Sequence, residues 1–179
     1  VNNAWRLATG RYIRFLDSDD FLSKGFIDAQ FDAAVATGAD LVYSRVDEFD
    51  HESGAIKAFD DPPLWDDFMA VQLGESYPSH FLGMLFKRWL IECVPRRPDF
   101  ALRDDRMFLL EVGLLNPTLA VVPGCCGYWV QHGTQMQRNY LGVRSVVANY
   151  QTLQLFRRIL GELEERGELT PRRKKAACR

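Results

Sequence analysis

A short apolar run that ends in a dense group of aspartates sets the strongest limit on how this chain folds. Residues 12–16 read Tyr-Ile-Arg-Phe-Leu, follow Gly10, and lead directly into Asp-Ser-Asp-Asp at residues 17–20. An apolar run of this length, bounded by turn-forming residues, is typical of a buried strand. Ligands of open α/β sheets bind beyond the carboxyl ends of the strands. The pattern therefore predicts a sheet that carries carboxylates at a ligand-binding edge.

Apolar periodicity along the rest of the chain predicts helices and strands in alternation. Ser23 is placed to cap a helix over residues 23–37, which Gly38 ends. Residues 40–49 predict a strand, followed by a hairpin turn at residues 50–54 and a second strand over 55–59. Helices are also expected over 2–9, 64–73 and 104–115, a strand running into a helix over 81–91, and strands over 118–122 and 127–131. This alternation indicates the α/β class.

The clearest helix lies near the end of the chain. Nine apolar side chains between Val143 and Leu163 recur at intervals of one and three residues, which predicts a single apolar stripe that packs on the domain or on a partner. The cations that follow predict a disordered basic tail. We therefore expect a domain over residues 1–140, an amphipathic helix over 141–169 and a tail over 170–179.

The charge balance argues against a nucleic-acid surface. The 22 basic and 24 acidic side chains give a net charge of −2, but five of the cations lie in the last ten residues. Residues 1–169 hold 17 basic and 24 acidic side chains, a net charge of −7. Nucleic-acid binding requires clustered Lys and Arg, so the acidic body favours a divalent cation instead. No apolar run approaches the roughly 18 residues of a membrane span, and we expect a cytoplasmic protein.

The aspartates after the first strand suggest a chemistry. Asp17 and Asp19 lie two residues apart, so both can project to one side of a strand end. Neighbouring carboxylates repel each other unless a cation neutralises them. Mg²⁺ or Mn²⁺ takes one or two protein carboxylates and completes its shell with water and substrate phosphates. The spacing thus fits a metal–diphosphate site, and the residues alone leave open a solvated turn that caps the following helix.

A longer motif surrounds these aspartates. Asn2 is followed by Ala-x-Gly-x-Tyr-Ile-x-Phe-Leu-Asp-x-Asp-Asp at residues 8–20. This run resembles the central stretch of family-two glycosyltransferases, and the resemblance extends to Gly133. It implies part of a GT-A domain, a mixed sheet flanked by helices that binds a nucleoside-diphosphate sugar and Mg²⁺ or Mn²⁺. It also implies Asp19 as the direct metal ligand, Asp17 at the ribose or the metal, and Asp20 beside the donor.

A second acidic pair, Asp104-Asp105, opens the helix expected over 104–115. Acidic residues there stabilise the helix dipole, which is the structural explanation. In the resemblance, an acidic pair at this distance, followed by an aromatic residue, supplies the general base, and Phe108 follows here. Asp105 matches the catalytic position, where a carboxylate that removes a proton contributes about 10²–10⁴-fold in rate.

A histidine late in the chain completes the candidate site. Trp129-Val130-Gln131-His132 is similar to the family's Tyr-Arg-x-His ending, with Trp129 in place of the Tyr and Val130 in place of the Arg. The resemblance makes His132 a candidate ligand of the metal or the phosphates, because imidazole can coordinate a metal. A lone histidine in a loop is otherwise a polar surface group.

The resemblance as a whole implies metal-dependent, inverting transfer of one sugar to an acceptor hydroxyl. The acceptor would be a glycan or lipid-linked, in cell-surface polysaccharide or glycolipid synthesis, with peripheral association at the inner face of the membrane. It also implies N-terminal nucleotide-binding strands ahead of Val1, so we expect this chain to be a fragment that is inactive alone.

Two other functions fit parts of the sequence. A phosphohydrolase would use Asp17 as nucleophile and Asp19 as acid and base, since a strand ending in Asp-x-Asp also serves that chemistry. A module without catalysis would instead dock a partner through the apolar stripe of residues 143–163.

Overall fold

The structure, a computed structural model, describes residues 2–76, 80–94, 98–133 and 142–178. The chain forms two compact units, each assembled from segments that are separated in the sequence. The first unit combines Val1–Trp65, Ser79–Glu92 and Pro117–Gln135, and the second combines Asp66–Pro78, Cys93–Asn116 and Met136–Arg179. This division differs from the expected one, because residues 66–78 and 93–116 join the C-terminal helices in one unit rather than the sheet.

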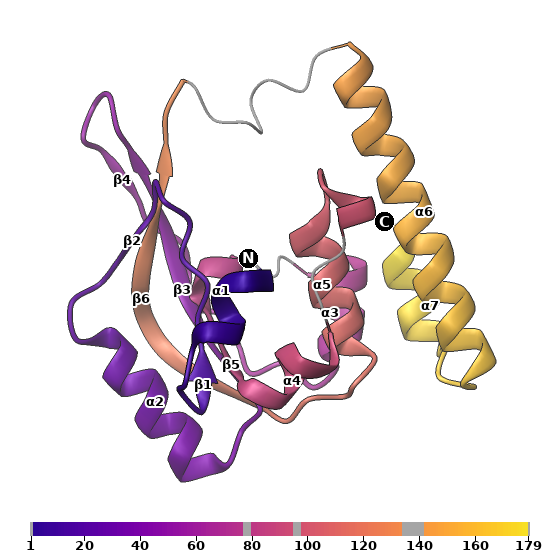
Figure 1. Cartoon of the computed structure of the whole chain (residues 1–179), viewed down its shortest axis with the longest axis horizontal. Coiled ribbons are helices and arrows are strands. Elements are labelled where there is room, and N and C mark those ends of the chain that lie inside the picture. The colour runs from indigo at the N-terminus through magenta and orange to yellow at the C-terminus, as the bar shows by residue number, and fades with distance from the viewer. Residues whose placement is uncertain (1, 77–79, 95–97, 134–141, 179) are drawn as a thin grey trace. The chain divides into compact units, whose positions relative to one another are not determined.

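The first unit is built on a mixed sheet with the strand order β1-β5-β3-β6-β2, and β4 pairs with β3. The strands β3 and β6 pair in parallel and run side by side along the curled sheet (Figure 1), whereas the other pairs are antiparallel. The strands are β1 Tyr12–Ile13, β2 Phe21–Leu22, β3 Leu41–Asp50, β4 Ile56–Lys57, β5 Met84–Lys87 and β6 Leu119–Gln131. The α/β class with a mixed sheet is thereby confirmed.

The helix α2 (Phe26–Thr37) packs against β3 and β6. Its inner side contributes Ala34 to an apolar cluster with Val42, Leu85 and Ala120. The buried amide of Gln30 donates to the Ser44 hydroxyl at 2.8 Å and to a backbone carbonyl at 3.0 Å, which satisfies its amide nitrogen inside that core. The unit also contains α1 (Asn2–Leu7), the short helix η1 (Phe81–Gly83) and the start of α4 (Arg88–Cys93).

Three local expectations in this unit differ from the structure. The first strand ends at Ile13, and Phe15 instead stacks its ring on Phe81 at 5.3 Å. Helix α2 starts three residues later than expected, after Gly25 at φ 74°, and no side chain caps it. The strands expected over 118–122 and 127–131 form one strand, because the irregular pairing near Gly124, at φ 110°, bends β6 without ending it.

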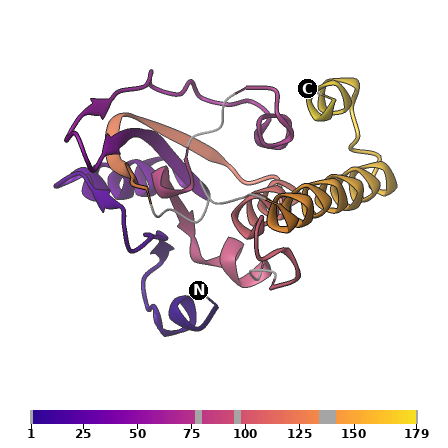
Figure 2. The same ribbon diagram turned by 90° about the horizontal axis from the view of Figure 1, so that it is seen from above.

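The second unit is helical. The helices α3, α5, α6 and α7 surround one apolar cluster that includes Met69, Met107, Leu155 and Ile159 (Figures 1 and 2). Its elements are α3 Phe68–Leu73, η2 Pro98–Phe100, α5 Asp104–Gly113, α6 Val143–Glu165 and α7 Pro171–Ala177. The helices expected over 104–115 and 143–163 are confirmed, whereas the one expected over 64–73 begins only at Phe68, because Asp67 caps it.

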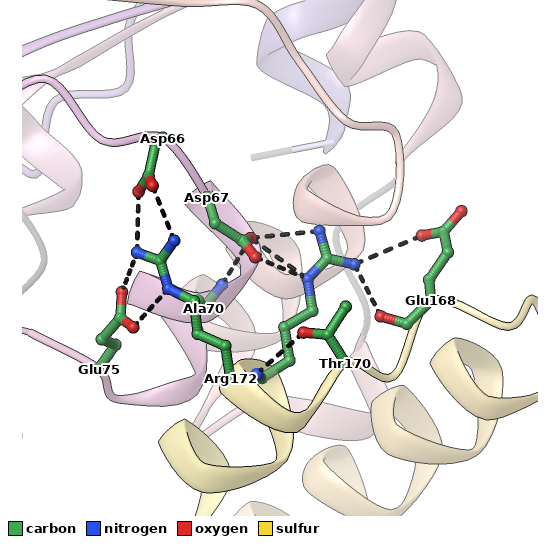
Figure 3. Close-up of polar contacts among 8 residues, drawn as sticks. Asp66, Asp67, Ala70, Glu75, Glu168, Thr170 and Arg172 are labelled. Carbon is green, nitrogen blue, oxygen red and sulfur yellow. Dashed lines mark hydrogen bonds and ion pairs between the residues drawn. The ribbon is translucent and has the colours of Figure 1, made fainter.

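The basic tail is folded rather than disordered. Thr170 caps α7 by accepting from the backbone N–H of Arg173 at 3.2 Å, and Pro171 occupies the first turn. Arg172 makes bidentate hydrogen bonds with Asp66 and Glu75 at 2.6–2.8 Å (Figure 3). The cations that predicted a disordered tail are therefore paired with carboxylates about a hundred residues away in the sequence.

Candidate active site

The acidic motif forms a turn that is tied to the end of β6. Asp20 donates its backbone N–H to the Asp17 carbonyl at 3.3 Å, and its Oδ1 accepts from the Val130 N–H at 2.9 Å. The second bond crosses 110 positions of sequence and fixes the motif beside the residues that follow Val130. Asp17 and Asp19 remain exposed, so their carboxylates face solvent at this edge of the sheet.

Asp19 and His132 form the most direct contact of the site. The His132 Nε2 lies 3.0 Å from the Asp19 Oδ2, with the side chains 25% and 42% exposed respectively. The bond joins the motif to the residue directly after β6. Four of the predicted site residues, Asp17, Asp19, Asp20 and His132, therefore belong to the same edge of the first unit.

The electrostatics of this edge favour a cation. The pKa of Asp20 is raised to about 6, first because the carboxyl is buried and also because of the charges of Asp19 and Asp17; the Val130 hydrogen bond and the charge of His132 act in the opposite direction. A carboxylate whose pKa is raised by like charges lies in a region of negative potential. A divalent cation bound here would relieve the repulsion.

A pocket of about 480 Å³ opens at this edge. Its lining combines the motif, the end of β6 and the hairpin that joins β3 to β4: Asp19, His51, Glu52, Val130, His132 and Gly133. The His51 backbone N–H donates to the Gln131 carbonyl at 2.9 Å, which holds the hairpin against β6.

His51 and Glu52 are the pocket residues that sequence reasoning missed. Their turn is recognisable in the sequence, but its position depends on the parallel register that places Asp50 opposite Gln131. That register joins segments about 80 residues apart, and no short-range pattern encodes it.

The residues present fit a hard divalent cation, with most of its shell supplied from outside the chain. The Asp19 Oδ2 and the His132 Nε2 lie within hydrogen-bond distance, 3.0 Å apart, and carboxylate oxygens are ligands that Mg²⁺ prefers. In the described parts of the chain, no three His, Cys, Asp or Glu side chains converge on one point. Water and substrate phosphates would have to complete the coordination.

Asp105, the predicted base, belongs to the second unit. It lies in the first turn of α5, partly exposed, beside Asp104. The other candidates lie in the first unit, so Asp105 and the Asp19–His132 pair are carried by different units.

One further charged side chain stands next to the motif. The three guanidinium nitrogens of Arg14 are buried, and none has a hydrogen-bond partner among the described residues. Burial lowers the pKa of Arg14. An unpaired buried cation is costly, so this position is suited to an anion.

The mixed sheet flanked by helices is similar to the GT-A fold of glycosyltransferases. A family model described as Glycosyl transferase family 2 matches residues 1–96, more than half of the sequence, and the chain belongs to that family. The matched range contains the acidic motif and the hairpin, while His132 and Asp105 lie beyond it.

Solved structures of S. aureus TarS share this fold. TarS 1–349 in complex with UDP-GlcNAc has a TM-score of 0.52 at 12% identity, covering 85% of this chain and 44% of that one. A second structure of TarS 1–349 has a TM-score of 0.51 at 13% identity, covering 72% of this chain and 38% of that one. The chain thus spans less than half the length of these structures, and no curated protein sequence matches it significantly.

The described residues include no helix that is long and apolar enough to cross a bilayer.

Proposed function

We propose that the protein containing this chain transfers one sugar from a nucleoside-diphosphate sugar to an acceptor hydroxyl, with inversion and with a divalent metal. The observation that supports this most directly is the convergence of the family motif and His132 on one acidic pocket. The family and the fold add to it.

The metal would be Mg²⁺ or Mn²⁺, held by Asp19 with Asp17 and His132. When bound, it would supply positive charge that neutralises the leaving diphosphate. Asp17 and Asp20 would position the donor, and the Asp20–Val130 bond would keep the motif in place for this. Exposed carboxylates at a sheet edge suit both roles.

Asp105 would accept the proton of the acceptor hydroxyl as the oxygen attacks the anomeric carbon from the face opposite the diphosphate. Its place in the first turn of α5 leaves it partly exposed and able to meet a substrate. A carboxylate in this role contributes about 10²–10⁴-fold in rate.

The donor and the acceptor belong to the same proposal. TarS was solved with UDP-GlcNAc, which makes a uridine-diphosphate sugar the first donor to test. We propose a glycan or lipid-linked acceptor in cell-surface polysaccharide or glycolipid synthesis, and a cytoplasmic protein at the inner face of the membrane.

The test compares Asp19→Asn and Asp105→Asn with Asp32→Asn in the whole protein. Asp32 is exposed on α2, away from the motif, so its substitution is a matched control for losing one carboxylate. We expect Asp19→Asn to remove metal-dependent transfer, and Asp105→Asn to slow it at least about 100-fold while donor binding is kept.

Three results would contradict this assignment. Transfer that survives Asp19→Asn with its metal dependence intact would remove the metal role. A phosphoenzyme trapped on Asp17 would indicate a phosphohydrolase. Metal binding without any transfer in the whole protein would favour a module that only binds.

A further inference from the structure

The helix α6 is apolar on two opposite sides. Its inner side contributes Leu155, Ile159 and Leu163, all fully buried in the second unit. A second set of apolar side chains is exposed, up to 79% for Val143, 68% for Val146 and 61% for Tyr150. The outer face, as we define it here, consists of Val143, Val146, Val147, Tyr150 and Leu153. The single stripe expected from the sequence is therefore two faces.

Helix geometry separates the two faces cleanly. At about 100° per residue, the outer face covers an arc of about 120° whose centre lies about 180° from the buried side chains. It occupies about 15 Å along the first half of the helix. The same arc becomes polar after Leu153, where it carries Arg157 and Glu164. The patch is thus confined to one end of α6.

The charges along the apolar half of α6 have one sign, whereas Glu164 lies further along the same arc. Residues 142–161 contain three arginines and neither Asp nor Glu. Arg158 pairs with Glu111 of α5 at 3.4 Å. Arg157 is exposed on the arc of the outer face just beyond Leu153, and Arg144 is exposed in the first turn of α6, about 60° outside that arc. An apolar face with one exposed cation beyond its end and another beside its first turn is complementary to an anionic surface with an apolar interior.

We propose that the outer face of α6 docks on an anionic lipid bilayer, with the helix lying in the interface. Helices of this kind bury their apolar side at the boundary between headgroups and acyl chains, and basic residues add electrostatic attraction to anionic lipids. Tyr150 lies near the middle of the face, and amphipathic aromatic rings favour this depth. The inference rests on the membrane association included in the proposed function and assigns it a surface.

A second copy of the chain is a poorer occupant. Two outer faces in contact would bring exposed arginines of both copies to the contact, while residues 142–161 offer no carboxylate to pair with them and Glu164 lies about 10 Å beyond Arg157 along the helix. Like charges brought together destabilise an interface. A lipid surface supplies the missing anions.

The experiment is co-sedimentation of the whole protein with vesicles of phosphatidylcholine alone or with about a third phosphatidylglycerol. We expect binding to the anionic vesicles only. The double variant Val146→Gln/Tyr150→Gln should lower the partition coefficient at least about tenfold. Arg144→Gln/Arg157→Gln should lower it about fivefold per arginine, because each cation adds about that much attraction to an anionic surface. Asn149→Gln, also exposed on α6, is the matched control and should bind as the unsubstituted protein does.

Two outcomes would overturn the inference. One is that the unsubstituted protein stays in the supernatant, or that Val146→Gln/Tyr150→Gln binds as well as Asn149→Gln. The other is a dimer in light scattering that Val146→Gln/Tyr150→Gln dissociates, which would assign the outer face to a second copy. Thermal unfolding verifies that the variants fold. Transfer to a water-soluble acceptor is measured in parallel, so loss of lipid binding and loss of transferase activity are told apart.

Discussion

Two adjacent arginines in α7 are expected to differ widely in what they contribute to stability. The Arg173 Nε lies 2.9 Å from the Asp67 Oδ2, and the two side chains are only 13% and 15% exposed. Asp67 also caps α3 by accepting from the Ala70 N–H at 2.9 Å. Arg172 binds carboxylates too, but it is 43% exposed and its partner Asp66 is 77% exposed (Figure 3).

The perturbation is Arg173→Met, which keeps the length of the side chain and removes its charge. Exposed ion pairs contribute about 0–1 kcal/mol, and breaking a fully buried one costs about 3–5 kcal/mol. The pair between Arg173 and Asp67 lies between these limits, so we expect the free energy of unfolding to fall by about 2 kcal/mol. Asp67→Asn should cost a similar amount, because Asn still caps a helix, and Asp67→Ala should cost about 1 kcal/mol more.

The assay is urea unfolding followed by circular dichroism in 0.1 and 0.5 M NaCl. Arg172→Met is the matched control; it should lower stability less than Arg173→Met, and salt should reduce its effect more, because exposed charges are screened. An equal or larger loss from Arg172→Met, or no loss from Arg173→Met, would refute the argument that burial decides the contribution. Additive losses in Arg173→Met/Asp67→Asn would show that the two side chains are not coupled.

Three further predictions concern the first unit. Burial raises the pKa of Asp40, but hydrogen bonds donated by Thr118, Trp89 and a lysine outweigh it and hold the pKa at about 2. The stability that Asp40 contributes is therefore present above about pH 4 and lost as the pH falls toward 2. The urea midpoint of Asp40→Asn should consequently depend less on acid pH than that of the unsubstituted protein. Tyr43→Phe should cost about 1–3 kcal/mol in urea unfolding, because the buried hydroxyl bonds the backbone of residues 63 and 65 at 2.7 Å and both groups would be left unsatisfied. Arg14→Met should raise the free energy of unfolding by about 1–3 kcal/mol, since it removes a buried charge that has no partner among the described residues. If calorimetry shows that Arg14→Met lowers the free energy of unfolding, Arg14 has a counter-ion beyond the described residues.

The elements that could be predicted from the sequence are those with strong local signals. The strand β3 and the helices α5 and α6 were predicted correctly because each depends on a pattern of residues a few positions apart. The acidic motif was identified for the same reason, since Asp17, Asp19 and Asp20 lie within one turn. Its contact with His132 could be expected only through the family resemblance.

The features that could not be predicted depend on residues distant in the sequence. Arg172 and Arg173 look like a solvated run of charge until α3 brings Asp66 and Asp67 to them. Periodicity located the apolar residues of α6 but did not show that they lie on two opposite sides of the helix, one buried and one exposed. Glu52 lines the pocket because of the register between β3 and β6, which cannot be predicted from the hairpin sequence alone.

The position of β6 in the sheet has a consequence for how the first unit folds. This strand is the last of the sheet in the chain, yet it lies between β3 and β2, with Leu41 pairing with Leu119 after 78 residues. During synthesis from the N-terminus, β2 and β3 must therefore wait until α3, β5 and α5 have been made before the strand that joins them emerges. Closing so long a loop costs entropy before any pairing compensates it, and such topologies fold slowly. The sheet edges that wait for β6 are the surfaces on which a nascent chain of this protein would aggregate.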